Sequence, residues 1–130
     1  MNTMCVGATT IRSPTAVADA RETARAFLEA LRQPTVDPEA ADTAVLVVSE
    51  LVTNALRHGG GTYTLRLAAH PDTIEVAVDD PSSQAPRMRT PDLNGGTGGF
   101  GWPMVNRLAR ATAVTRQPSG GKTVSALLAR

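Results

Sequence analysis

The stretch TAVLVVSELVTNALRHGG, residues 43–60, predicts a long amphipathic helix at the centre of the fold. The pair Asp-Pro at 37–38 supplies an N-cap and a first-turn proline, and Gly59 supplies a C-terminal cap. Glu50 and Asn54 share a stripe at the border of the apolar face, where such a stripe can roof a pocket. At about 100° per residue, that apolar face consists of Ala44, Val48, Leu51, Val52 and Ala55.

The Glu50 and Asn54 pair has two interpretations. An acid and an amide four residues apart on a helix are usually an ordinary solvated pair, so the spacing alone indicates little. Asparagine, however, is a poor residue for the interior of a helix, and its place beside a carboxylate favours a functional role. The rest of the sequence has to decide between the two.

Residue patterns on both sides of this helix indicate a single α+β domain covering residues 1–130. Apolar residues at helical spacing predict an earlier helix, and alternating residues predict two later hairpins. This order is typical of a two-layer α/β sandwich with helices on one face of a mostly antiparallel mixed sheet. The expected elements are an edge strand at 6–11, a helix from Ser13 to Pro34, strands at 62–69 and 73–79, a helix at 103–111, and strands at 112–116 and 122–128.

Two glycine-rich segments invite comparison with phosphate-binding loops. Gly96-x-Gly98-x-x-Gly101 fits the dinucleotide pattern, but no strand precedes it and no acid follows it, so a Rossmann site is rejected. The segment GGKT at 120–123 resembles the end of a P-loop, but an arginine stands where the first glycine belongs. The aperiodic stretch 81–99 is rich in Pro, Gly, Ser and Thr, and we expect it to be a functional lid rather than a disordered loop.

Composition excludes several classes of protein. The chain has 42% hydrophobic residues and a net charge of +1, which fits a globular protein and gives no overall field to gather nucleic acid. Its single cysteine, Cys5, excludes an internal disulfide, and with His58 and His70 it gives no metal-ligand spacing. The sequence contains neither a membrane-length apolar run nor a signal core. We therefore expect a cytoplasmic protein without direct contact to nucleic acid or membrane.

Four segments together resemble one known family. They are SELVTNALRHG at 49–59, VAVDD ending at Asp80, GGTGGFG at 95–101, and GKTVSALL at 121–128. The set resembles the histidine-kinase-like ATPases (GHKL family), and within them the small anti-sigma-factor serine/threonine kinases. The resemblance covers nearly all of the chain and implies the Bergerat-type ATP-binding fold.

The resemblance implies a role for each residue of the helix at the centre. Asn54 corresponds to the family's ligand for Mg²⁺, which bridges the phosphates of ATP. Glu50 corresponds to the residue that accepts or orients the proton of the attacking hydroxyl. His58 ends this helix and can either touch the nucleotide or merely cap and pack, and the sequence leaves both open.

The other three segments imply the remainder of a nucleotide site. Asp80 resembles the acid that binds adenine, and alternation along its strand points it inward in preference to Asp79. The glycines after that acid in the family are replaced by DDPSSQAP in this chain. Thr123 resembles a threonine near adenine, and we favour it over Lys122, which can approach a phosphate. The lid's phosphate-binding residues would be Gly98, Gly99, Phe100 and Gly101.

The resemblance implies a kinase that uses ATP and Mg²⁺ to phosphorylate a STAS-type anti-sigma-factor antagonist and that sequesters a sigma factor. A homodimer is expected on the same basis, and Leu46, on the polar side of the helix, can join a homodimer or partner surface. One alternative is a nucleotide-sensing module that holds its partner without catalysis, against which Glu50 argues. The ATP-binding half of a sensor histidine kinase would need a separate partner chain.

Overall fold

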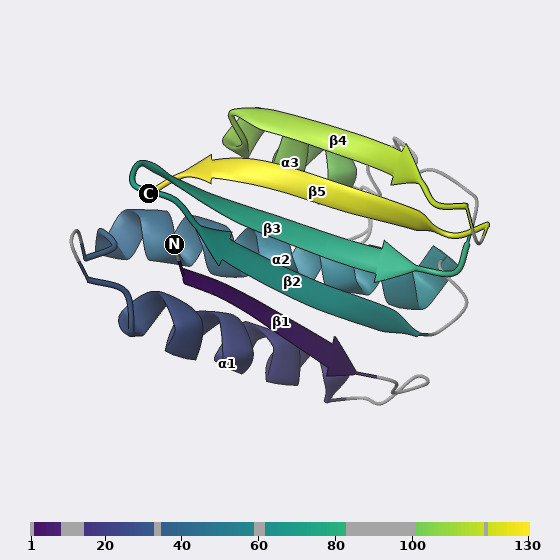
Figure 1. Cartoon of the computed structure of the whole chain (residues 1–130), viewed down its shortest axis with the longest axis horizontal. Helices are drawn as coiled ribbons and strands as arrows, with labels where there is room; N and C mark the ends of the chain where they lie inside the picture. Colours follow the sequence, from purple (N-terminus) through teal and green to yellow (C-terminus); the bar gives the residue numbers. More distant parts are fainter. Residues whose placement is uncertain (1, 9–14, 33–34, 59–61, 83–100, 119) are drawn as a thin grey trace, which may run out of the picture.

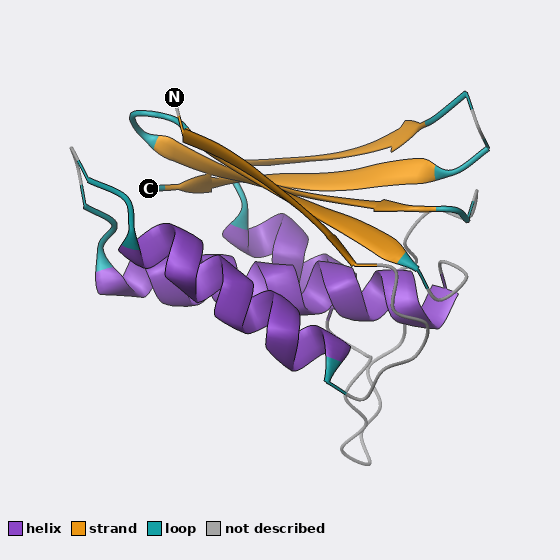
Figure 2. Ribbon diagram, turned by 60° about the horizontal axis from the view of Figure 1, so that its bottom comes forward, coloured by secondary structure: helices purple, strands orange, loops and turns teal. Residues whose placement is uncertain are grey.

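The computed structural model describes residues 2–8, 15–32, 35–58, 62–82, 101–118 and 120–130. Within these residues the chain forms a two-layer α+β structure, with all the helices on one face of a sheet (Figures 1 and 2). The elements are β1 (Asn2–Ala8), α1 (Ala16–Glu29), α2 (Pro38–His58), β2 (Tyr63–Ala69), β3 (Thr73–Asp80), α3 (Gly101–Leu108), β4 (Ala111–Arg116) and β5 (Lys122–Ala129).

The sheet has the strand order β1-β2-β3-β5-β4. The α+β class and both hairpins are confirmed, and all four pairings between described strands are antiparallel rather than mixed. In sequence, β3 is followed by α3 and then by β4, which lies at the edge of the sheet. The last strand, β5, lies between β3 and β4 (Figure 1). The register pairs Thr73 with Ala129 and Asp80 with Lys122, so β5 begins where β3 ends.

Helix α2 lies at the centre of the helical layer. It contacts α1, α3 and the strands β2, β3 and β5. The predicted apolar face is confirmed, since all five of its residues are buried. Val45 and Val47 are buried as well, because α1 and the sheet cover adjoining sides of the helix. Leu46 points away from this core and is 40% exposed.

Element ends differ most from the predictions where no strong capping residue marks them. β1 begins and ends earlier than expected, whereas α2 runs from Pro38 to the residue before Gly59, as its caps predict. Helix α3 begins at Gly101 and includes Pro103 in its first turn, where a proline is tolerated because no intrahelical acceptor is lost. Among the described helices, none combines the length and the hydrophobicity needed to span a bilayer.

Candidate functional site

A buried ion pair closes the end of the sheet at which α2 also finishes (Figure 1). Asp80 is the last residue of β3 and Lys122 is the first residue of β5, and the two are register partners. Their side chains are only 3% and 5% exposed, and Lys122 Nζ lies 2.9 Å from Asp80 Oδ1. Charges at this depth are tolerated only when they are paired and hydrogen-bonded.

The side chain of Asp80 lies on the helix-facing side of the sheet because strand residues alternate between faces. Ile74, Val76 and Val78 share its face of β3 and are all buried. On β5, Lys122 likewise heads a row of buried alternate residues. The prediction that Asp80, rather than Asp79, points inward is confirmed. The role of Asp80 in ligand binding stays a prediction.

The hydrogen bonds around the ion pair are unevenly distributed. Asp80 Oδ1 accepts both from Lys122 Nζ and from the backbone N–H of Ser82, the latter at 2.8 Å. Lys122 Nζ also donates to the carbonyl oxygen of Ser82 at 3.4 Å. Among the described residues, Asp80 Oδ2 accepts no hydrogen bond. Asp80 Oδ2 is therefore available to accept a hydrogen bond from a group outside the described residues.

Gly121 brings the start of β5 close to the end of β3. A Cβ at this position would lie 2.4 Å from the carbonyl oxygen of Asp80 and 3.2 Å from the Cα of Pro81. The preceding Gly120 has φ of 98°, a left-handed conformation that favours glycine. The two glycines thus allow the turn to deliver Lys122 directly beside Asp80.

A second polar cluster occupies the opposite face of the sheet. Arg66 Nη2 lies 2.7 Å from Asp79 Oδ1, and the hydroxyl of Thr123 donates to the same oxygen. Gln117 Nε2 donates to Thr123 Oγ1 at 2.9 Å. We predicted that Thr123 would lie beside the same ligand as Asp80, and this placement is wrong. Thr123 pairs in register with Asp79, so its side chain leaves the sheet on the face away from the helices.

Glu50 and Asn54 lie one turn apart in the second half of α2, and both are half-buried. Burial raises the pKa of the Glu50 carboxyl, and the positive charge of Arg57 partly opposes this effect. A carboxylate with a raised pKa is a stronger proton acceptor once it is ionised. Across the described residues, no three His, Cys, Asp or Glu side chains cluster as a metal site. The amide oxygen of Asn54, on α2, is an oxygen donor of the kind that Mg²⁺ binds.

Several predicted site residues lie outside the described part of the chain. Gly98, Gly99 and Phe100 fall there, and the side chain of His58 is not described although it closes α2. Gly101 is the first residue of α3, which contacts α2 and anchors itself through the buried Val105. The lid prediction is therefore untested, apart from the fact that a helix does begin at its last glycine.

Lys122, which the sequence favoured less than Thr123, is the residue that the structure places beside Asp80. We considered it for a phosphate, but it is buried against Asp80. The signal was present in the alternation of β5, where Lys122 takes the same phase as Val124, Ala126 and Leu128. A lysine in phase with a buried row needs an acidic partner, and the register supplies one.

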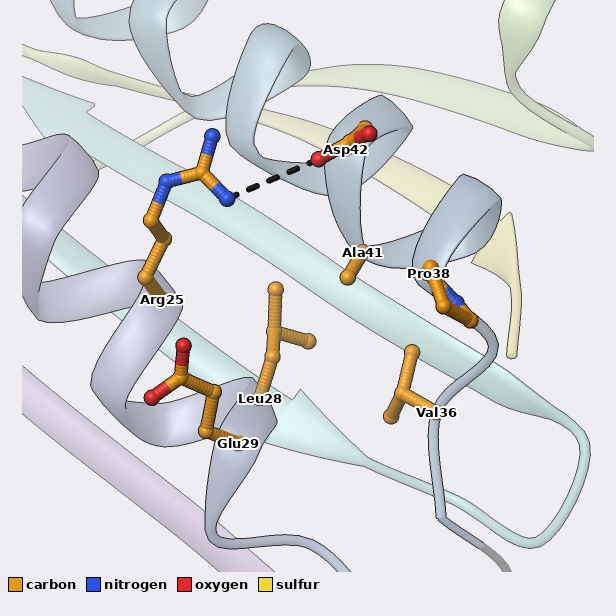
Figure 3. Close-up of a pocket in the computed structure, with 7 residues that line it drawn as sticks. All are labelled: Arg25, Leu28, Glu29, Val36, Pro38, Ala41 and Asp42. Carbon is orange, nitrogen blue, oxygen red and sulfur yellow. Dashed lines mark hydrogen bonds and ion pairs between the residues drawn. The ribbon is translucent and has the colours of Figure 1, made fainter.

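A separate hollow of about 260 Å³ lies between α1 and the beginning of α2 (Figure 3). Arg25 Nη1 and Asp42 Oδ1 approach to 3.5 Å across it. This hollow is at the end of α2 remote from Asp80 (Figure 1), and it includes none of the predicted site residues. Its lining residues are Arg25, Leu28, Glu29, Val36, Pro38, Ala41 and Asp42.

Solved structures of other proteins share this fold. Solved structures with a similar fold include the RsbU and RsbW domains of Rv1364c from Mycobacterium tuberculosis (TM-score 0.68, 17% identity, 98% of this chain). The present chain spans only 32% of that chain. The SiaB-SiaC complex from Pseudomonas aeruginosa gives a TM-score of 0.68 at 13% identity, covering 96% of this chain and 88% of that one.

At these identities the two structures establish the fold alone. A search among curated proteins found no significant match. The sequence itself is more decisive, because residues 13–127 match the family model of the histidine kinase-like ATPase domain. That match covers most of the chain, including α2, the ion pair and α3. The chain therefore belongs to the histidine kinase-like ATPase family.

Proposed function

We propose that this protein is an ATP-binding regulatory serine/threonine kinase of the anti-sigma-factor type. The observation that supports it best is the buried Asp80 carboxylate, which faces the helical layer and keeps Oδ2 without a partner among the described residues. The amino group of adenine is a hydrogen-bond donor, and a carboxylate oxygen is its natural acceptor. Family membership makes ATP the ligand to test first.

The phosphates would extend from Asp80 toward the second half of α2. Asn54 offers an amide oxygen that fits as one ligand of Mg²⁺, with the remaining ligands coming from the phosphates and water. When bound, the metal would neutralise charge on the phosphates. The N-terminus of α3 at Gly101, with Gly98, Gly99 and Phe100, would supply backbone N–H groups for the phosphates.

Glu50 is the proposed general base. Its carboxylate would accept the proton of a serine or threonine hydroxyl while the oxygen attacks the terminal phosphate of ATP. The raised pKa of Glu50 strengthens it as a base, and its half-buried position on α2 leaves it accessible to a substrate. Phosphoryl transfer needs mainly positioning and charge neutralisation, so these few groups suffice in principle.

The proposed acceptor is a STAS-type antagonist protein, and the proposed sequestered partner is a sigma factor. In support, one structure with a similar fold contains RsbW and RsbU domains together, and the other is a complex of SiaB with SiaC. A homodimer through the exposed Leu46 is part of the same proposal. The alternative is a nucleotide-sensing module without catalysis. The presence of Glu50 at this position of α2 favours the kinase, because sequestration alone requires no proton acceptor.

The deciding experiment compares Glu50→Gln with the wild type in two assays. Binding of ATP should be unchanged, whereas transfer of phosphate to purified STAS-type proteins, detected by intact mass, should fall by roughly 10²- to 10⁴-fold. Glu75→Gln is the matched control, because Glu75 lies on the outer face of β3 and its replacement should leave transfer intact. Undiminished transfer by Glu50→Gln would remove Glu50 from the mechanism. ATP binding without any transfer by the wild type would favour the sensing module.

A further inference from the structure

We propose that Lys122 determines base specificity by donating a hydrogen bond to N1 of adenine while Asp80 Oδ2 accepts from the amino group at C6. The inference rests on the proposed function in one respect, namely that Asp80 receives the base. It adds a second recognition residue that the family resemblance did not place there. The new role belongs to a lysine whose position in the register, directly opposite Asp80, fixes where its ammonium lies.

The Lys122 ammonium has one N–H that donates to no described residue. A lysine ammonium has three N–H donors, and Lys122 uses one toward Asp80 Oδ1 at 2.9 Å and one toward the Ser82 carbonyl at 3.4 Å. Within the described residues no third acceptor is present for it. A buried donor without an acceptor is unfavourable, so a ligand that supplies one gains affinity from it.

The Asp80 carboxylate has one oxygen that accepts no hydrogen bond among the described residues. Asp80 Oδ1 is occupied by Lys122 and by the Ser82 N–H, whereas Oδ2 accepts nothing among the described residues. An open acceptor and an open donor are therefore held side by side by one salt bridge. Because the two side chains are 3% and 5% exposed, little water competes for either position.

Adenine matches this pair of open positions. Its amino group at C6 is a donor and the adjacent ring atom N1 is an acceptor, so the two bonds run in opposite directions, as the site requires. Guanine presents a carbonyl oxygen and an N–H at the same positions. Its carbonyl oxygen would face the Asp80 carboxylate, which is also an acceptor, and its N–H would face the Lys122 ammonium, which is also a donor. Sites with buried polar groups reject a ligand that leaves those groups unpaired far more strongly than apolar sites reject an extra group.

The lysine is also held in place by the backbone. Gly121 lets β5 start so close to β3 that even a Cβ would meet the carbonyl oxygen of Asp80 at 2.4 Å. Lys122 is the register partner of Asp80, so an outward shift of Lys122 would break the pairing of the two strands at this point. This pre-organisation is what a specificity residue needs, since its donor is already in position before the ligand arrives.

The test replaces one atom of the ligand. Calorimetric titrations would compare ATP with 1-deaza-ATP, in which a C–H replaces N1, on the wild type, Lys122→Met and Thr123→Val. The wild type should bind 1-deaza-ATP roughly tenfold to a hundredfold more weakly, the range expected for a hydrogen bond from a charged donor. In Lys122→Met that gap should close to within about twofold. Thr123→Val is the control, because Thr123 lies on the opposite face of the sheet, and it should keep the gap.

The outcomes separate this inference from the proposed function. If the wild type binds neither nucleotide, the proposed function fails. If it binds both equally, or if the gap persists in Lys122→Met, ATP binding stands and the role of Lys122 is overturned. Should Lys122→Met not fold, the double variant Asp80→Asn with Lys122→Met removes both buried charges. The amide oxygen of Asn still accepts from adenine, so this double variant should also show no gap.

Discussion

Replacing Lys122 with methionine should destabilise the fold strongly, even in the absence of any ligand. Methionine preserves most of the length and volume of the lysine stem, so the change removes chiefly the positive charge and its hydrogen bonds. Asp80 would then keep a buried negative charge whose remaining described partner is the backbone N–H of Ser82. The perturbation thus isolates the contribution of the ion pair.

The expected magnitude follows from burial. Breaking a buried ion pair by removing one partner costs about 3–5 kcal/mol, and the exposures of 3% and 5% place this pair in that class. For a chain of 130 residues, an unfolding entropy of about 2.1 cal/mol/K per residue converts this cost into a melting temperature roughly 10–20 °C lower. The pair Arg66 and Asp79 provides the contrast, because its side chains are 43% and 25% exposed.

Urea unfolding and a thermal melt followed by circular dichroism would measure both variants without nucleotide. Arg66→Met should cost no more than about 1 kcal/mol, as is usual for an ion pair open to solvent. The double variant Asp80→Asn with Lys122→Met should recover much of the stability lost in Lys122→Met, because it leaves no buried charge without a partner. If Lys122→Met cost less than about 1 kcal/mol, comparable to Arg66→Met, the pair would not be the buried interaction described above.

Two further predictions concern Glu50 and the turn before β5. Burial raises the folded-state pKa of Glu50 above its ordinary value of 4.5, so the stability contributed by its protonated form is fully present below pH 4.5 and is lost as the pH rises through the folded-state pKa. The melting temperature of Glu50→Gln should therefore exceed that of the wild type by a growing amount as the pH rises above 4.5, and a pH-independent difference would contradict the raised pKa. Gly120→Ala should lower the free energy of unfolding in urea by roughly 1–2 kcal/mol, because residue 120 has a left-handed backbone. Gly121→Ala should lower it by more, because a Cβ at 121 meets the Asp80 carbonyl oxygen whereas one at 120 meets open space. Equal losses would contradict the close approach.

Local signals made the central helix predictable. Asp37 and Pro38 indicate where α2 begins, and Gly59 indicates where it ends. The structure places the helix at Pro38–His58. Alternation likewise identified Asp80 as the inward acid of β3. Both features depend on a few neighbouring residues, so the sequence alone contains the information. The ends of β1 had no comparable capping or turn residues, and the prediction missed them by several positions.

The missed parts of the site depend on contacts between distant segments. Lys122 and Asp80 are 42 residues apart in sequence, and nothing local to either one indicates the other. Their pairing follows from the strand order, in which β5 returns between β3 and β4. Thr123 was misplaced for the same reason, because the family resemblance indicated its box but not the face on which the register with Asp79 would put its hydroxyl. Resemblance thus identified the segments, and the register decided which side chain faces the site.

Asp80 is the proposed acceptor for adenine, and titration calorimetry of ATP with Mg²⁺ tests this role most directly. The proteins to compare are the wild type, Asp80→Asn and Asp79→Asn, each confirmed as folded at the temperature of measurement. The wild type should bind ATP, Asp80→Asn should bind it roughly tenfold or more weakly, and Asp79→Asn should match the wild type because Asp79 lies on the other face of the sheet. Equal affinity for all three, or no binding by the wild type, would contradict the account.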